Sequence, residues 1–64
     1  MERGTIGWWD KLTEVEQVAI YNKWVKISRD MRKQFSLKEI NTDEAAIEIM
    51  LREVKNSMFG FDFL

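Results

Sequence analysis

A chain of 64 residues has room for one domain, and it buries a smaller share of its surface than a larger domain, so its own core contributes little stability. The sequence contains neither cysteine nor histidine, which excludes disulfides, thiolate metal sites and the commonest general base of enzymes. Its ten basic and eleven acidic residues give a net charge of −1, so the chain as a whole does not attract polyanions such as nucleic acid.

The distribution of helix-breaking residues favours an all-α protein. There is no proline, and the glycines stand at positions 4, 7 and 60, so residues 8–59 contain no strong breaker. Nothing at the start resembles a signal peptide, and no apolar run approaches the roughly 18 residues of a membrane-spanning helix. We therefore expect a cytoplasmic all-α protein with no membrane partner, formed as a single domain over residues 1–64.

The first predicted helix follows an aromatic segment at residues 5–9. In "LTEVEQ", the Thr13 hydroxyl can accept from the backbone N–H of Glu16 while the Glu16 carboxylate accepts from that of Thr13, which is a capping box. Apolar side chains then recur at the spacing of one helical face: Ile20, Trp24, Ile27, Met31 and Phe35. The pattern predicts a helix over about residues 13–35.

The second predicted helix follows the polar connector "SLKEIN". Asn41 or Thr42 is the expected N-cap, and acidic residues fill the first turn, where the helix dipole favours them. The apolar face consists of Ile47, Met50, Leu51, Val54 and Met58. Gly60 is suited to ending the helix, which gives a predicted extent of about residues 42–58. A connector of about six residues favours an antiparallel hairpin of the two helices.

The first helix carries a second apolar row, formed by Val18, Tyr21 and Val25. This row widens the apolar arc to about half of the circumference, which calls for more than one packing partner. A second copy of the hairpin would cover the row and complete a four-helix bundle, so we expect a homodimer with these residues as the self-interface. The alternative is that the aromatic terminal segments cover the row within one chain. The expected intramolecular core is Ile20, Trp24, Ile27, Met31, Ile47, Leu51 and Val54.

A group of basic residues raises the question of nucleic-acid binding. Lys26, Arg29 and Lys33 lie along one predicted helix face, as in phosphate-binding proteins. In an antiparallel hairpin, however, the acidic residues within 39–48 would lie beside this face and neutralise it. We therefore expect surface ion pairs and no nucleic-acid partner, with an anion-binding regulator as a third alternative.

Side chains arranged for catalysis are missing from the sequence. Glu44 and Glu48 lie one helical turn apart, but Arg52 follows Glu48 at the spacing of an ordinary surface ion pair. The segment "RGTIGWW" lacks the glycine spacings of phosphate-binding loops. We expect no enzymatic activity, no cofactor and no metal site.

The tail segment, residues 59–64, is rich in aromatic residues and allows two interpretations. In an antiparallel hairpin it meets Trp8 and Trp9, so the two aromatic segments can pack together as an end-cap. Alternatively, the tail extends, in which case Phe59, Phe61 and Phe63 project to one side and fill pockets on a partner.

The last four residues, "FDFL", support the second interpretation through a resemblance. They are similar to the C-terminal tails by which polymerases and late-transcription coactivators of large tailed phages attach to their sliding clamp. This resemblance implies that Phe63 and Leu64 are pocket-filling anchors, with Asp62 as their polar neighbour and Phe61 as a flanking apolar contact. It covers four of the 64 residues.

Two functions therefore follow from the sequence. The first is a non-enzymatic interaction or adaptor module that acts as a homo-oligomer. The alternative is a phage-type transcription or replication accessory protein that hooks a sliding clamp or polymerase through its tail.

Overall fold

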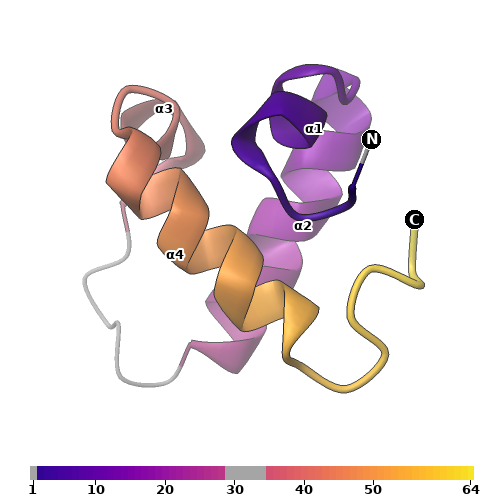
Figure 1. Cartoon of the computed structure of the whole chain (residues 1–64). Helices are drawn as coiled ribbons and strands as arrows, with labels where there is room; N and C mark the ends of the chain where they lie inside the picture. Colours follow the sequence, from indigo (N-terminus) through magenta and orange to yellow (C-terminus); the bar gives the residue numbers. More distant parts are fainter. Residues whose placement is uncertain (1, 29–34) are drawn as a thin grey trace.

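The computed structural model describes residues 2–28 and 35–64. Over these residues the chain forms four α-helices and no strand, which confirms the all-α prediction (Figure 1). The helices are α1 (Ile6–Asp10), α2 (Glu14–Ile27), α3 (Leu37–Ile40) and α4 (Glu44–Lys55).

Side-chain caps fix where the helices begin. The Thr13 hydroxyl accepts from the Glu16 N–H at 3.2 Å and the Glu16 carboxylate accepts from the Thr13 N–H at 3.0 Å, which confirms the capping box of α2. A second box, formed by Ser36 and Glu39, starts α3 inside the stretch expected to be a polar connector. The Ser-x-x-Glu spacing is the sequence signal for this helix. Thr5 is the N-cap of α1, and its hydroxyl accepts from the Trp8 N–H.

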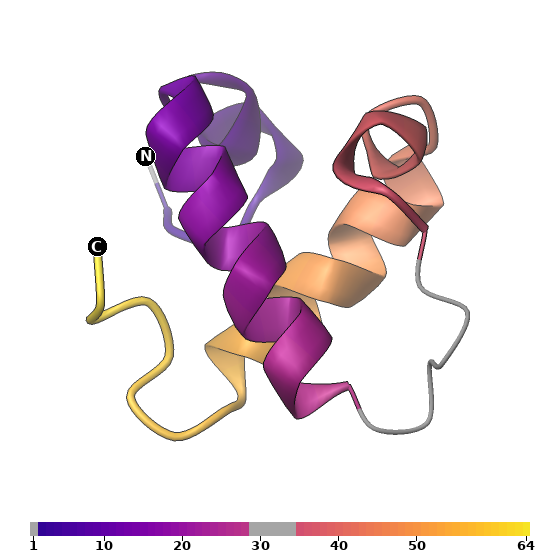
Figure 2. The same ribbon diagram turned by 180° about the vertical axis from the view of Figure 1, so that it is seen from behind.

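Helix α4 is the centre of the fold, because it contacts each of the other three helices. It crosses α2, with α1 and α3 on either side of the crossing (Figures 1 and 2). The buried apolar side chains are Trp9, Ile20, Trp24, Ile40, Ile47, Met50, Leu51, Val54 and Phe61. The core therefore draws on α1, α3 and the tail segment as well as on the two longer helices.

The crossing brings the carboxyl-terminal halves of α2 and α4 together. The Trp24 indole N–H donates to the Glu53 carboxylate at 3.1 Å, and the Lys23 ammonium reaches the residues that follow α4. An antiparallel pair would instead place Trp24 near the start of the second helix. The connection is longer than the expected six residues, since α2 ends at Ile27 and α4 begins at Glu44, and a chain of that length does not impose antiparallel packing.

Most of the core predicted from apolar spacing is buried. The confirmed members are Ile20, Trp24, Ile47, Leu51 and Val54. Ile27 was expected among them but is 36% exposed, because it lies beyond the last buried side chain of α2, Trp24. Met31 lies outside the described residues.

The first helix is shorter than predicted. It ends at Ile27, with Ser28 as C-cap at ψ 75°, instead of continuing to Phe35. Residues 29–34 of the predicted extent lie outside the described part of the chain, and Phe35 itself belongs to no helix. In proteins most helix stability comes from packing of the apolar face, and α2 loses that packing after Trp24.

The second helix differs from the prediction at both ends. Its N-cap is Asp43, which accepts from the Ala45 N–H at 3.0 Å. Asn41 and Thr42 were the expected caps, but the side-chain Oδ1 of Asn41 accepts from the Trp9 indole N–H at 2.8 Å and the Thr42 hydroxyl donates to the Glu39 carbonyl. At the other end the helix stops at Lys55 instead of Met58. Val54 is its last buried residue, and Met58 is 79% exposed.

Candidate functional site

The tail segment folds into turns, so of its two interpretations the extended one is wrong. Backbone N–H groups of Gly60, Asp62 and Leu64 each donate to the carbonyl three residues earlier, at 2.9–3.1 Å. Phe59 and Gly60 have φ angles of 70° and 51°, in the left-handed region. As a result the three phenylalanines do not share one side: Phe61 is 5% exposed, whereas Phe59 is 72% and Phe63 is 41% exposed.

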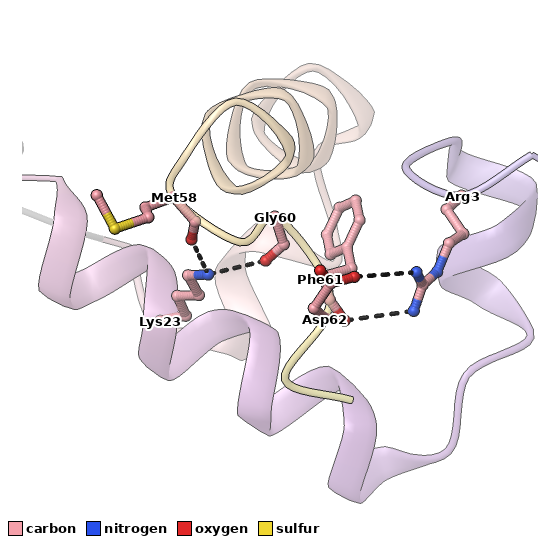
Figure 3. A network of polar contacts seen from close by, with 6 residues as sticks. All are labelled: Arg3, Lys23, Met58, Gly60, Phe61 and Asp62. Carbon is pink, nitrogen blue, oxygen red and sulfur yellow. Dashed lines mark hydrogen bonds and ion pairs between the residues drawn. The ribbon is translucent and has the colours of Figure 1, made fainter.

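Phe61 anchors the tail in the core beside the N-terminal segment. Its ring centroid lies 4.8 Å from that of Trp8, and its carbonyl accepts from the Arg3 guanidinium at 3.3 Å. Arg3 also pairs with the exposed Asp62 carboxylate at 3.9 Å (Figure 3). The predicted packing of the two aromatic segments is therefore confirmed at Trp8 and Phe61.

Lys23 holds the tail against α2. Its ammonium donates to the carbonyls of Met58 and Gly60 at 3.0 and 2.8 Å, as Figure 3 shows. The same nitrogen lies 4.8 Å from the centroid of the Phe63 ring, a cation–π contact. Sequence reasoning missed this role, because the acceptors are main-chain carbonyls 35 and 37 residues away and leave no signal in the residue types.

Between α2 and the tail lies an open groove of about 620 Å³, which we call the tail groove. Its lining consists of Ala19, Asn22, Lys23, Lys26, Ile27, Phe59, Asp62 and Phe63. The apolar part is contributed from both sides, by Ile27 of α2 and by Phe59 and Phe63 of the tail. The volume lies within the range of pockets that bind ligands or peptide side chains.

The charge of the tail groove is positive. Asp62 is its one acidic lining residue, and its carboxylate pairs with Arg3. Lys23 has two carbonyls as hydrogen-bond acceptors, which are neutral and leave its charge uncompensated. Lys26 is exposed, and within residues 2–28 and 35–64 it makes no ion pair. The groove thus joins an apolar lining to two lysines.

The predicted self-interface lies elsewhere on α2. Val18 and Val25 are each 37% exposed. Tyr21 is half-buried beside Trp24, with ring centroids 6.2 Å apart, and its hydroxyl donates to the Phe35 carbonyl at 3.0 Å. At 3.6 residues per turn these three residues lie about 140–160° around the helix from Lys23. Self-interface and tail groove are therefore centred on different sides of α2, and they border each other at Asn22, which lies one turn from Val18 and Val25.

The expected neutralisation of the basic face by residues 39–48 is not seen in the described part of the chain. Ion pairs there join Arg3 to Asp62 and Lys55 to Glu2. Lys26 is exposed, while Arg29 and Lys33 lie outside the described residues. Lys23, one turn before Lys26, donates to main-chain carbonyls of Met58 and Gly60 and not to an acidic residue of 39–48.

Comparisons of the chain with protein-family models, with curated proteins and with solved structures give no match. Among the residues described, no three acidic side chains gather closely enough to hold a metal ion. The helices of that part also lack the length and apolar character needed to pass through a lipid bilayer. Inferences about function therefore rest on the surface geometry itself.

Proposed function

We propose that the protein is a non-enzymatic protein–protein interaction module that acts as a homodimer. The observation that carries this proposal is the exposure of Val18 and Val25 on a face of α2 that the other described residues leave partly open. The aromatic terminal segments were the alternative cover for this face. The tail instead packs beside Lys23, about 140–160° around α2, and so leaves the valines accessible to a second copy.

In the proposed dimer, the Val18, Tyr21 and Val25 row of one protomer packs against the same row of its partner about a two-fold axis. Such an interface is self-complementary, since each residue meets its own counterpart or a near neighbour. The α2 and α4 helices of the two copies then form a four-helix bundle, with the crossing α2–α4 pair taking the place of the expected antiparallel hairpin. Burial of two valines and the edge of one tyrosine from each copy removes apolar surface from water, and this hydrophobic effect drives the association of the two copies.

The molar mass in solution tests the dimer. Light scattering after gel filtration should give twice the chain mass of 7.7 kDa at high micromolar concentration. Val25→Glu should return the mass to that of one chain, because it places a carboxylate in the apolar interface. Met58→Glu is the matched control, since Met58 is an exposed apolar residue that lies outside α2. A monomeric wild-type chain, or equal effects of both variants, would reject the proposed interface.

A second function, attachment to a sliding clamp, is supported by one observation on the tail. Phe63 and Leu64, the anchors implied by the resemblance, are each 41% exposed, whereas the flanking Phe61 is buried. Anchoring by the last two residues is compatible with a tail that stays folded. The proposal predicts that Phe63→Ala combined with Leu64→Ala abolishes capture by an immobilised phage sliding clamp without unfolding the body. Failure of the wild-type chain to bind the clamp would dismiss it.

A further inference from the structure

We propose that the tail groove binds an acidic amphipathic helix of a partner protein. This inference rests on the proposed function as an interaction module and names the chemistry of its partner. It concerns a different face of α2 from the homodimer interface, so either can fail without the other.

The shape and the fold favour a helix as the ligand. Exposed apolar side chains from α2 and from the tail face one open space of about 620 Å³, in which Ala19 is the small residue on the α2 side. A partner could also bind by adding a strand to a sheet edge, but residues 2–28 and 35–64 contain no strand to accept one. Of these two recognition modes, docking of an apolar helix face into a groove is the one that the described surface permits.

The charge of the groove selects an acidic helix over a basic one. Lys23 and Lys26 lie one turn apart on α2, and no carboxylate among the described residues pairs with either of them. The acidic lining residue, Asp62, is already paired with Arg3. A helix whose apolar residues are flanked by glutamates would meet both lysines, whereas a lysine-rich helix would be repelled.

The conformation of Phe59 is a second, independent reason to place a contact here. Non-glycine residues with φ near 70° are uncommon, and bulky side chains are strained there. The ring is also 72% exposed, so the chain itself gains little by burying it. Backbone strain that presents an exposed aromatic ring at the rim of a groove is typical of residues that contact a partner.

The experiment uses fluorescein-labelled synthetic peptides and the full chain. The probe is a helix of about four turns with leucines along one face, glutamates beside them and alanine or glutamine elsewhere. One comparison peptide has lysines in place of the glutamates, and another has serines in place of the leucines. We expect fluorescence anisotropy to show that the acidic peptide binds at least tenfold more tightly than either comparison peptide.

Two variants with matched controls locate the binding site. Lys26→Glu should weaken binding of the acidic peptide about tenfold, while Lys38→Glu, the same charge change at an exposed residue of α3, should not. Phe59→Gly should weaken binding by a similar factor without lowering the melting temperature, because glycine adopts the left-handed φ without strain. This variant separates loss of contact from loss of fold.

Several results would overturn the inference. These are equal binding of the lysine-rich peptide, equal effects of Lys26→Glu and Lys38→Glu, or unchanged affinity in Phe59→Gly. A second copy of the chain as the true occupant would appear as self-association that Lys26→Glu removes in the absence of peptide. By contrast, a monomeric protein that binds the acidic peptide would reject the homodimer and leave this inference standing. Val25→Ser, which disrupts the apolar row without adding charge beside Lys26, should leave the peptide affinity unchanged.

Discussion

The indole N–H of Trp24 donates a hydrogen bond of 3.1 Å to the carboxylate of Glu53, and this bond ties α2 to α4. Trp24 is almost fully buried, so its N–H needs an acceptor within the protein. Glu53 is half-buried beside it and supplies that acceptor. The pair fixes which parts of the two helices lie together.

Removing the acceptor should therefore destabilise the fold. We expect Glu53→Ala to lower the free energy of unfolding by about 1–2 kcal/mol, because it leaves a buried donor unsatisfied. Glu53→Gln keeps a carbonyl acceptor and should recover most of the loss. Urea titration followed by tryptophan fluorescence measures both, with Glu48→Ala as the control at an exposed position of α4. A loss as large in Glu48→Ala would contradict the assigned role.

Lys23 should control the folding of the tail. Lys23→Met keeps the aliphatic part of the side chain but removes the donors to the Met58 and Gly60 carbonyls, at a cost of about 1–2 kcal/mol. Hydrogen exchange should accelerate at the Asp62 and Leu64 amides, which donate within the tail turns, more than in α4. Unchanged exchange in the tail would show that Phe61 alone holds it.

The two phenylalanines of "FDFL", Phe61 and Phe63, should contribute differently to the free energy of unfolding. Phe61→Ala removes a buried ring that packs on Trp8, and we expect it to cost about 3–5 kcal/mol. Phe63→Ala removes a half-exposed ring and should cost less than about 1 kcal/mol. Thermal unfolding by circular dichroism compares them. Equal effects would mean that the tail does not fold as described.

Helix α3 should respond to pH through Glu39. The Ser36 backbone N–H and then its side chain hydrogen-bond to the Glu39 carboxylate and hold the pKa of that carboxyl below its ordinary value of 4.5. A lowered pKa in the folded state means that the ionised carboxylate stabilises α3 above pH 4.5, and that this contribution is lost as the pH falls through the lowered pKa.

Amide chemical shifts of Leu37 to Ile40 followed from pH 7 downward check this expectation. They should move in the wild-type chain as Glu39 protonates, and they should stay flat in Glu39→Gln, whose amide does not titrate. An identical shift in both chains would assign the pH dependence to another carboxyl.

Local sequence signals determined much of the secondary structure. The Thr13–Glu16 capping box sets the start of α2, because both hydrogen bonds form within one turn and need no distant partner. The spacing of Ile20 and Trp24 likewise identified the face that is buried. The Ser36–Glu39 capping box is equally local, so the start of α3 could have been predicted from the sequence in the same way.

Only part of the candidate site could be predicted from the sequence. Aromatic residues at both ends of the chain predicted that Trp8 and the tail would meet, which they do through Phe61. Which phenylalanine is buried could not be predicted, since the turns at Phe59 and Gly60 break the alternation of an extended chain. The tail groove was also missed, because it is lined from two segments whose contact depends on Lys23.

The sequence by itself determined that this protein is helical, where α2 starts and which residues form most of the core. Only the tertiary structure decided where α2 ends, how it crosses α4 and which tail residues remain exposed. The physical reason is the range of the interactions. Caps and apolar spacing act within a few residues, whereas the bonds from Trp9 to Asn41 and from Lys23 to Gly60 join residues 32 and 37 positions apart and exist only once the chain has folded.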